Sequence, residues 1–142
     1  MTCKKHLKKP IKIFLIIIVC ILVFNIIYFL SKPIRLPNKL VEKYLFLEIP
    51  KDTTMEDAIF EIEKNEWEIR KINYDYGVHF GKNSKPNTIN LENEENLVGS
   101  KFIYVYLGEY TVVFECFVYA YLIFDENSKL IQIVVIKDLE AM

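Results

Sequence analysis

The sequence predicts an α+β protein in which an N-terminal single transmembrane helix is followed by a two-layer domain of one helix packed on an antiparallel β-meander. Three observations support this prediction. Residues 13–30 are almost entirely apolar, residues 53–65 carry the pattern of one amphipathic helix, and residues 102–137 contain three β-rich runs. A helix followed by consecutive strands is typical of an α+β domain.

The charge of the chain is divided sharply, although the net formal charge of its 142 residues is only −1. Residues 1–43 hold nine Lys or Arg against the single acid Glu42, which gives +8, whereas residues 44–142 hold nine basic and eighteen acidic residues, which gives −9. This division is typical of a membrane-proximal segment followed by a water-exposed domain. Because an acidic domain repels phosphates, we expect no nucleic-acid partner.

The apolar run at residues 13–30 has the length of a membrane-spanning helix. As a helix it would rise about 27 Å, close to the roughly 30 Å thickness of the hydrocarbon core. Fifteen of its 18 residues are Ile, Leu, Val or Phe. At roughly 0.3–0.6 kcal/mol each, these favour the bilayer by about 5–9 kcal/mol, which Asn25 does not overturn. The predicted partner of this run is therefore the lipid bilayer, as a permanent anchor.

Two other interpretations of this run stay open. A cleaved signal peptide has a shorter apolar region and ends at small residues, but Phe29 and Ser31 stand where small residues are needed. A lipoprotein signal would use Cys20, but Val19 precedes it where the signal has Gly, Ala or Ser, and ten membrane-type residues follow. As part of an anchor, Cys20 is a small apolar packing residue.

The rest of the chain divides around this run. Residues 1–12 form a basic tail, residues 31–43 a basic Pro-containing linker that is expected to be extended, and residues 44–142 the α+β domain. The lysines before residue 13 favour a cytoplasmic N-terminus and an extracytoplasmic domain, so the predicted location is the cell membrane, crossed once. Cys116 is the one cysteine after residue 43, so no disulfide bond can form within the domain.

The clearest helix signal lies at residues 53–65. Thr53 and Glu56 have the spacing of a capping box, and Asn65 is a plausible end of the helix. The predicted buried face consists of Met55, Ala58, Ile59 and Ile62. Residues 44–49 alternate in polarity and predict a short strand or an extended lead-in to this helix.

Strands are predicted after this helix. In residues 67–76 the apolar positions change phase, which predicts a strand with a bulge near Arg70 and Lys71. Residues 77–100 form a long polar loop, in which only residues 88–91 could add a strand. Strands at about 102–107, 111–124 and 130–137 follow, the last two joined by a hairpin turn at 125–129.

The sequence offers no set of residues that performs chemistry. His79 is the one histidine of the domain, and no nucleophile with its base, metal-ligand spacing or Gly-rich phosphate loop is present. Glu92, Glu94 and Glu95 are adjacent acids without a calcium-loop pattern, and Cys116 is expected to be a buried packing residue. We therefore expect no enzyme activity, no cofactor and no metal ion.

Tyrosines on the predicted sheet are the candidate partner-binding residues. Tyrosine combines a large contact area with a hydroxyl group and a low entropy cost, which is typical of binding surfaces. The alternative is that these tyrosines pack within the protein and leave only their hydroxyls at the rim. The candidates are Tyr104, Tyr106, Tyr119 and Tyr121, with Tyr110 in the same row.

The layout of these elements carries a resemblance to known families. Thr54, Met55 and Glu56 begin the predicted helix, and residues 124–130 form the hairpin of the meander. In this layout the chain resembles the small SmpA/OmlA (BamE-type) and BLIP-like α+β domains of bacterial envelope proteins. It departs from them at Asp52, where such families often place Gly, and it lacks an evident second helix and a lipobox. The resemblance implies the fold and a non-enzymatic role, and it assigns no functional residue.

Two functions follow as hypotheses. The first is a non-catalytic protein-binding module at the cell envelope that binds its partner with the tyrosine-bearing sheet face or the 77–100 loop. The second is a membrane-tethered immunity or inhibitor protein whose acidic domain neutralises a basic toxin or enzyme by charge complementarity. An enzyme is a third class, for which no acid, base and nucleophile can be named.

Overall fold

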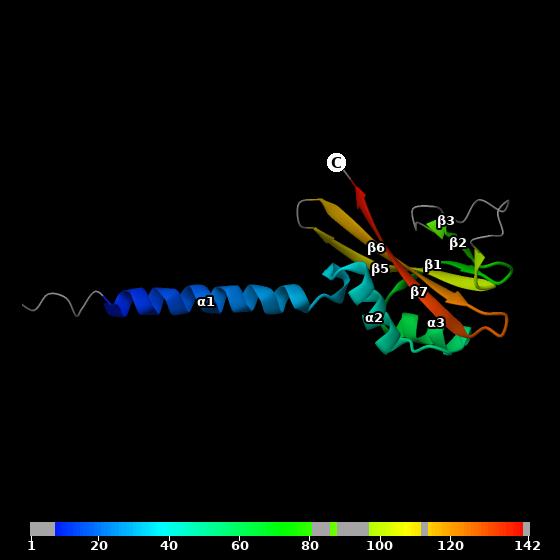
Figure 1. The fold of residues 1–142 in the computed structure, drawn as a ribbon, viewed down its shortest axis with the longest axis horizontal. Coiled ribbons are helices and arrows are strands. Elements are labelled where there is room, and N and C mark those ends of the chain that lie inside the picture. Colours follow the sequence, from blue (N-terminus) through cyan, green and yellow to red (C-terminus); the bar gives the residue numbers. More distant parts are fainter. Residues whose placement is uncertain (1–7, 81–85, 88–96, 112–113, 141–142) are drawn as a thin grey trace, which may run out of the picture.

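The computed structural model describes residues 8–80, 86–87, 97–111 and 114–140. Its helices are α1 (Lys8–Leu30), the short 3₁₀ helix η1 (Pro33–Arg35), α2 (Asn38–Glu48) and α3 (Met55–Lys64). The strands are β1 (Glu68–Asn73), β2 (Val78–Phe80), β3 (Pro86–Asn87), β4 (Leu97–Val98), β5 (Lys101–Thr111), β6 (Glu115–Phe124) and β7 (Leu130–Glu140). Figure 1 shows α1 extending away from a domain in which α2 and α3 lie along one side of a twisted sheet.

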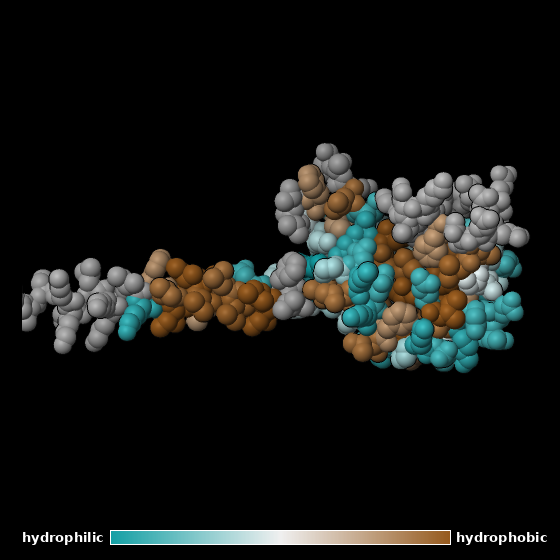
Figure 2. Space-filling view, in the orientation of Figure 1, coloured by the Kyte–Doolittle hydropathy of each residue, from teal (hydrophilic) through white to brown (hydrophobic). Residues whose placement is uncertain are grey.

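Helix α1 requires a correction to the predicted fold class. Its side chains are described for residues 12–28; they are exposed and, apart from Lys12 and Asn25, mostly apolar, as Figure 2 shows. Among the described residues, no helix is both long enough and apolar enough to cross a membrane. The transmembrane anchor predicted at residues 13–30 is therefore wrong.

The main sheet confirms the predicted antiparallel meander. Its four strands lie in the order β1-β5-β6-β7, and each neighbouring pair is antiparallel. The turn between β6 and β7 is the predicted hairpin, in which Asp125 Oδ1 accepts a hydrogen bond of 2.8 Å from the Lys129 N–H. The register of β1 against β5 shifts between Ile69 and Lys71, as predicted. Because of this bulge, Ile69 and Ile72 both face the helices.

Two helices cover this sheet, where the sequence predicted one. Helix α2 occupies residues that were expected to form an extended linker and a short strand. Val41, Leu45 and Ile49 are spaced four apart, which places them on one side of a helix, and each is at most 1% exposed. Pro37 directly precedes α2, a position where its fixed φ and missing N–H fit a helix start. One face of α2 thus belongs to the core of the domain, and Ile34 of η1 packs against it.

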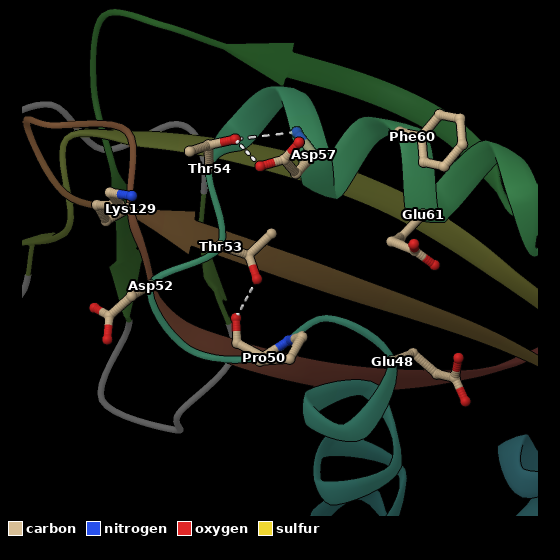
Figure 3. Close-up of a pocket in the computed structure, with 9 residues that line it drawn as sticks. All are labelled: Glu48, Pro50, Asp52, Thr53, Thr54, Asp57, Phe60, Glu61 and Lys129. Carbon is tan, nitrogen blue, oxygen red and sulfur yellow. Dashed lines mark hydrogen bonds between the residues drawn. The ribbon is translucent and has the colours of Figure 1, made fainter.

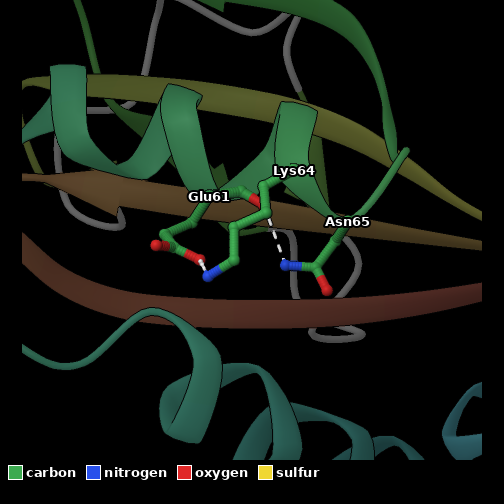
Figure 4. Close-up of polar contacts among 3 residues, drawn as sticks. All are labelled: Glu61, Lys64 and Asn65. Atoms are coloured by element: carbon green, nitrogen blue, oxygen red, sulfur yellow. Dashed lines mark hydrogen bonds and ion pairs between the residues drawn. The ribbon is translucent and has the colours of Figure 1, made fainter.

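Helix α3 is present as predicted, although its N-cap lies one residue later. The Asp57 N–H donates to Thr54 Oγ1 at 3.2 Å, and the Thr54 hydroxyl donates to Asp57 Oδ2 at 2.7 Å. The helix ends at the predicted Asn65, whose side-chain amide donates to the Glu61 carbonyl at 2.8 Å, as Figure 4 shows. The same figure shows the ion pair of 2.7 Å between Lys64 and Glu61. Both ends of α3 are therefore closed by side chains next to the helix.

A small second sheet lies within the predicted 77–100 loop. It has the order β3-β2-β4, and the predicted strand at 88–91 lies outside the described residues. Val78 of β2 is fully buried with Phe102 and Ile123, on the face of the main sheet opposite the helices. Gly77 allows this arrangement, since a Cβ atom there would collide with the backbone of Val98 and Gly99. The small sheet therefore covers one part of the outer face of the main sheet.

Candidate functional site

The four predicted tyrosines meet on the outer face of the main sheet. Tyr104 pairs across the strands with Tyr121, and Tyr106 pairs with Tyr119. Residues at alternate positions of a strand share a face, so these four side chains all project away from α2 and α3. Tyr110 belongs to the other face, because a register shift between Tyr106 and Gly108 reverses the alternation, and it packs against the core beneath the helices.

These tyrosines belong to a longer row of rings, which we call the aromatic ladder. It runs through Tyr76, Phe102, Tyr121, Tyr104, Tyr119, Tyr106 and Phe117, with 6.2, 5.7, 4.5, 5.3, 5.4 and 6.5 Å between successive ring centroids. Such cross-strand pairs of aromatic side chains stabilise a sheet by roughly 0.2–1 kcal/mol each. The ladder is therefore a structural feature as well as a candidate surface.

The orientation of the rings decides what the ladder can present to a partner. The Tyr104 ring lies at 22° to the Tyr119 ring and at 27° to the Tyr121 ring. Rings lying side by side in one plane could not approach to 4.5 Å, so these rings face one another in offset stacks. Their faces are occupied by each other, and the surface presents ring edges and hydroxyls. This is a poor platform for stacking nucleic-acid bases, which need free ring faces.

One end of the ladder is covered and the other is open. Tyr121 is 7% exposed and packs in a buried cluster with Val78, Phe102 and Ile123 under the small sheet. The residues at the other end are half-buried, with Tyr104 packed against this cluster and the Arg70 guanidinium over the Tyr106 ring. We call this group the open end of the ladder; it consists of Tyr104, Tyr106, Phe117 and Tyr119.

The hydroxyls of the open end stay protonated in neutral solution. Desolvation by the neighbouring rings raises the pKa of Tyr104 to about 12, with smaller contributions from Tyr121 and Tyr119. Desolvation, followed by the hydrogen bond to Glu109, also raises the pKa of Tyr106 to about 12. The Tyr104 hydroxyl is therefore a hydrogen-bond donor, whereas the Tyr106 hydroxyl already donates to Glu109.

Charged side chains flank the open end. The Arg70 guanidinium lies 5.1 Å from the centroid of the Tyr106 ring and 3.0 Å from a carboxylate oxygen of Glu68. On the other side, the Tyr106 hydroxyl donates to Glu109 Oε2 at 2.9 Å. Arg70 reaches the ladder because the bulge of β1 turns it toward this face. The sequence predicted that bulge, but it did not predict the contact between Arg70 and the Tyr106 ring.

A separate cleft of about 360 Å³ lies between the end of α2 and the start of α3, as Figure 3 shows. Its lining is formed by Glu48, Pro50, Asp52, Thr53, Thr54, Asp57, Phe60, Glu61 and Lys129. The Asp57 carboxylate accepts a hydrogen bond from the Thr54 hydroxyl and Glu61 pairs with Lys64, so two of its four carboxylates have structural partners. Among the described residues, no group of three His, Cys, Asp or Glu side chains is placed to hold a metal ion. The predicted acid run at Glu92, Glu94 and Glu95 lies outside the described residues.

Cys116 is buried on the inner face of the sheet, as the sequence predicted. It is 3% exposed and hydrogen-bonds with the Tyr110 hydroxyl, which also accepts a hydrogen bond of 3.2 Å from Lys137 Nζ. Lys137 donates in addition to the Leu36 carbonyl at 2.6 Å, and burial lowers the pKa of this lysine. These contacts hold η1 against the sheet.

Searches against protein family models, curated proteins and solved structures gave no match to this chain. The resemblance to SmpA/OmlA and BLIP-like domains and the location of the chain therefore stay predictions.

Proposed function

We propose that this chain is a non-catalytic protein-binding module whose partner covers the open end of the ladder. The observation that supports this proposal is that the side chains on the two faces of the main sheet differ in burial. Val105, Val118 and Ala120 face α2 and α3 and are fully buried, whereas the aromatic rings of the open end are only partly buried. Contiguous exposed apolar surface on a folded domain marks an interaction site more often than a neutral surface.

The chemistry of the open end fits a protein partner. Tyrosines bury a large apolar area at the cost of few rotatable bonds, and the ladder has already fixed their rotamers. Stacking holds Tyr104 between Tyr119 and Tyr121, so little side-chain freedom is left to lose on binding. The protonated Tyr104 hydroxyl can donate to a backbone carbonyl or a carboxylate of the partner.

An inhibitor of a basic protein is a second candidate. The net charge of −9 over residues 44–142 favours it, because an acidic surface steers a basic partner and speeds their association. It is a special case of the first proposal, in which the partner is an enzyme or a toxin.

The proposal is tested by capturing the partner with the full chain, identifying it, and measuring its affinity for single variants. Tyr106→Ser and Tyr119→Ser each remove a ring from the open end and should weaken binding by roughly tenfold or more, as for a central interface residue. Phe60→Ser is the matched control, since Phe60 is an aromatic residue of α3 that is 65% exposed. Equal affinities for the ladder variants and the wild type, with all variants folded, would contradict the proposal.

A further inference from the structure

The main sheet extends beyond the two helices that cover it. Figure 1 shows the ends of β5, β6 and β7 reaching past α2 and α3. We call this part the far end of the sheet; it consists of residues 108–111 of β5, 115–118 of β6 and 137–140 of β7, which pair with one another. Phe117 of the open end of the ladder lies on its outer face. The inner face of the far end therefore needs cover from an element other than α2 and α3.

The 3₁₀ helix η1 packs on this inner face. Ile34 of η1 is partly buried against the core, and a Cβ atom at position 108 would lie 3.3 Å from Ile34 Cδ1. Gly108 follows the register shift of β5, which lies between Tyr106 and Gly108. Glycine at position 108 thus lets η1 lie directly beneath the irregularity that separates Tyr106 from the far end.

A lysine of β7 holds η1 in this place. Lys137 Nζ donates to the carbonyl of Leu36, the residue that follows η1, at 2.6 Å, and to the Tyr110 hydroxyl at 3.2 Å. The same amine lies 5.1 Å from the centroid of the Tyr110 ring. Because a charged donor makes stronger hydrogen bonds than a neutral one, this amine is well suited to lock the chain after η1 on both β5 and β7.

The burial of Cys116 shows how closely η1 and the sheet are joined. Its thiol is buried and hydrogen-bonds with the Tyr110 hydroxyl. Leu139, which pairs with Cys116 across the strands and shares its face, is 65% exposed. The sheet alone therefore does not bury side chains at the far end, and Cys116 is covered where Tyr110 and Lys137 connect the sheet to the chain after η1.

We propose that η1 is a strap, locked by Lys137, that holds the far end of the main sheet in place and so positions Tyr106 and Phe117 for the partner. The inference rests on the proposed function and assigns a positioning role to residues on the opposite face of the sheet. Strands that are ordered before binding lose less conformational freedom when the partner docks. Opening of the strap would both loosen the far end and expose Cys116.

The first test measures how fast a maleimide labels Cys116 in the full chain, with Cys3→Ser and Cys20→Ser removing the other two thiols. Lys137→Met keeps the unbranched side chain but removes the donor, and should raise the labelling rate by about fivefold or more. Ile34→Ala weakens the strap at its apolar contact and should raise the rate as well, so it provides the test if Lys137→Met does not fold. Low urea should leave these increases unchanged, because local opening exposes little surface.

The matched control lowers the stability of a distant element. Thr54→Ala removes the cap of α3, and it should change the labelling rate by less than about twofold, because Cys116 is labelled through opening of the strap. Equal increases for Lys137→Met and Thr54→Ala would show that labelling follows global unfolding, and would overturn the inference. An unchanged rate in both Lys137→Met and Ile34→Ala would also overturn it.

The captured partner separates failure of this inference from failure of the proposed function. If Lys137→Met is labelled faster and binds the partner about threefold or more weakly, while Thr54→Ala binds as the wild type does, the inference is supported. If Tyr106→Ser weakens the partner and Lys137→Met does not, the protein-binding role stands and the positioning role is wrong. Unaltered partner affinity in both variants would overturn the proposed function together with the inference.

Discussion

Tyr104 shows how single residues set the chemistry of the ladder. Its ring is stacked between Tyr119 and Tyr121, so both of its faces are in contact with other rings. The same contacts displace water from the hydroxyl and raise the pKa of Tyr104 to about 12. The rings that form the surface therefore also keep its hydroxyls in the donor form.

A first prediction concerns the stability of the fold at high pH. The pKa of Tyr104 is about 12 in the folded chain against an ordinary value of 10.0, so the folded state holds this proton more tightly. The resulting stability is complete below pH 10 and is lost as the pH rises toward 12. Tyr104→Phe should therefore make urea unfolding midpoints depend less on pH across this window. At pH 7 the same variant should differ from the wild type by less than about 0.5 kcal/mol, and an unchanged slope between pH 10 and 12 would refute the prediction.

A second prediction concerns the cap of α3. Thr54→Ala removes the acceptor of the Asp57 N–H bond and should lower the free energy of unfolding by about 1 kcal/mol. Thr54→Ser keeps the hydroxyl and should have at most half that effect. Denaturant titrations of both variants provide the measurement. A larger loss for Thr53→Ala than for Thr54→Ala would place the cap at the residue that the sequence suggested.

Helix α2 shows how one element protects another. Asn38 Nδ2 donates to the Val135 carbonyl at 3.0 Å, and the Val135 N–H donates to Glu42 Oε1 at 3.2 Å. Both backbone groups of Val135 lie at the outer edge of β7, the last strand of the main sheet. Side chains of α2 therefore satisfy an edge that could otherwise pair with another chain.

A third prediction tests this edge protection. Glu42→Ala leaves the Val135 N–H without its acceptor and should lower the free energy of unfolding by about 1–2 kcal/mol. We also expect more self-association as the concentration rises, which sedimentation velocity can measure. Glu42→Gln preserves the acceptor and is the control. Equal stability and association of the Ala and Gln variants would argue against a role for this contact.

The elements differ in how well the sequence predicted them. Helix α3 and the meander were predicted because each has one dominant periodicity and clear turn residues. Helix α2 was missed because Tyr44 to Ile49 are mostly apolar. The pattern of such a short apolar segment is compatible with a strand and with the end of a helix. The informative signal was the spacing of Val41, Leu45 and Ile49, which crosses the boundary that was drawn between linker and domain.

A fourth prediction separates the two interpretations of residues 44–49. A strand would place Leu45 and Leu47 on the same face, whereas α2 places Leu45 in the core and leaves Leu47 80% exposed. Leu45→Ala should therefore lower the free energy of unfolding by about 2–5 kcal/mol. Leu47→Ala should change it by less than about 0.5 kcal/mol. Similar losses for the two variants in denaturant titrations would favour the strand.

At the scale of the whole molecule, the two faces of the main sheet have different roles. The inner face forms the core with α2 and α3, and the outer face is divided between the small sheet and the open end of the ladder. The sequence singled out Tyr104, Tyr106, Tyr119 and Tyr121 as candidate partner-binding residues, but it left open whether they pack within the protein. It could not predict which of them the small sheet covers, because that contact joins residues far apart in the chain. The predicted membrane anchor was wrong, because among the described residues no helix is both long enough and apolar enough to cross a membrane.

The central claim is that a protein partner covers the open end of the ladder, and hydroxyl-radical footprinting of the full chain with and without the captured partner tests it most directly. We predict that oxidation of Tyr104, Tyr106, Phe117 and Tyr119 falls severalfold in the complex. Phe60 and Tyr74, which are 65% and 60% exposed and lie outside the open end, should be oxidised equally in both states. Unchanged oxidation of the four ladder residues, with protection found elsewhere on the domain, would contradict the account.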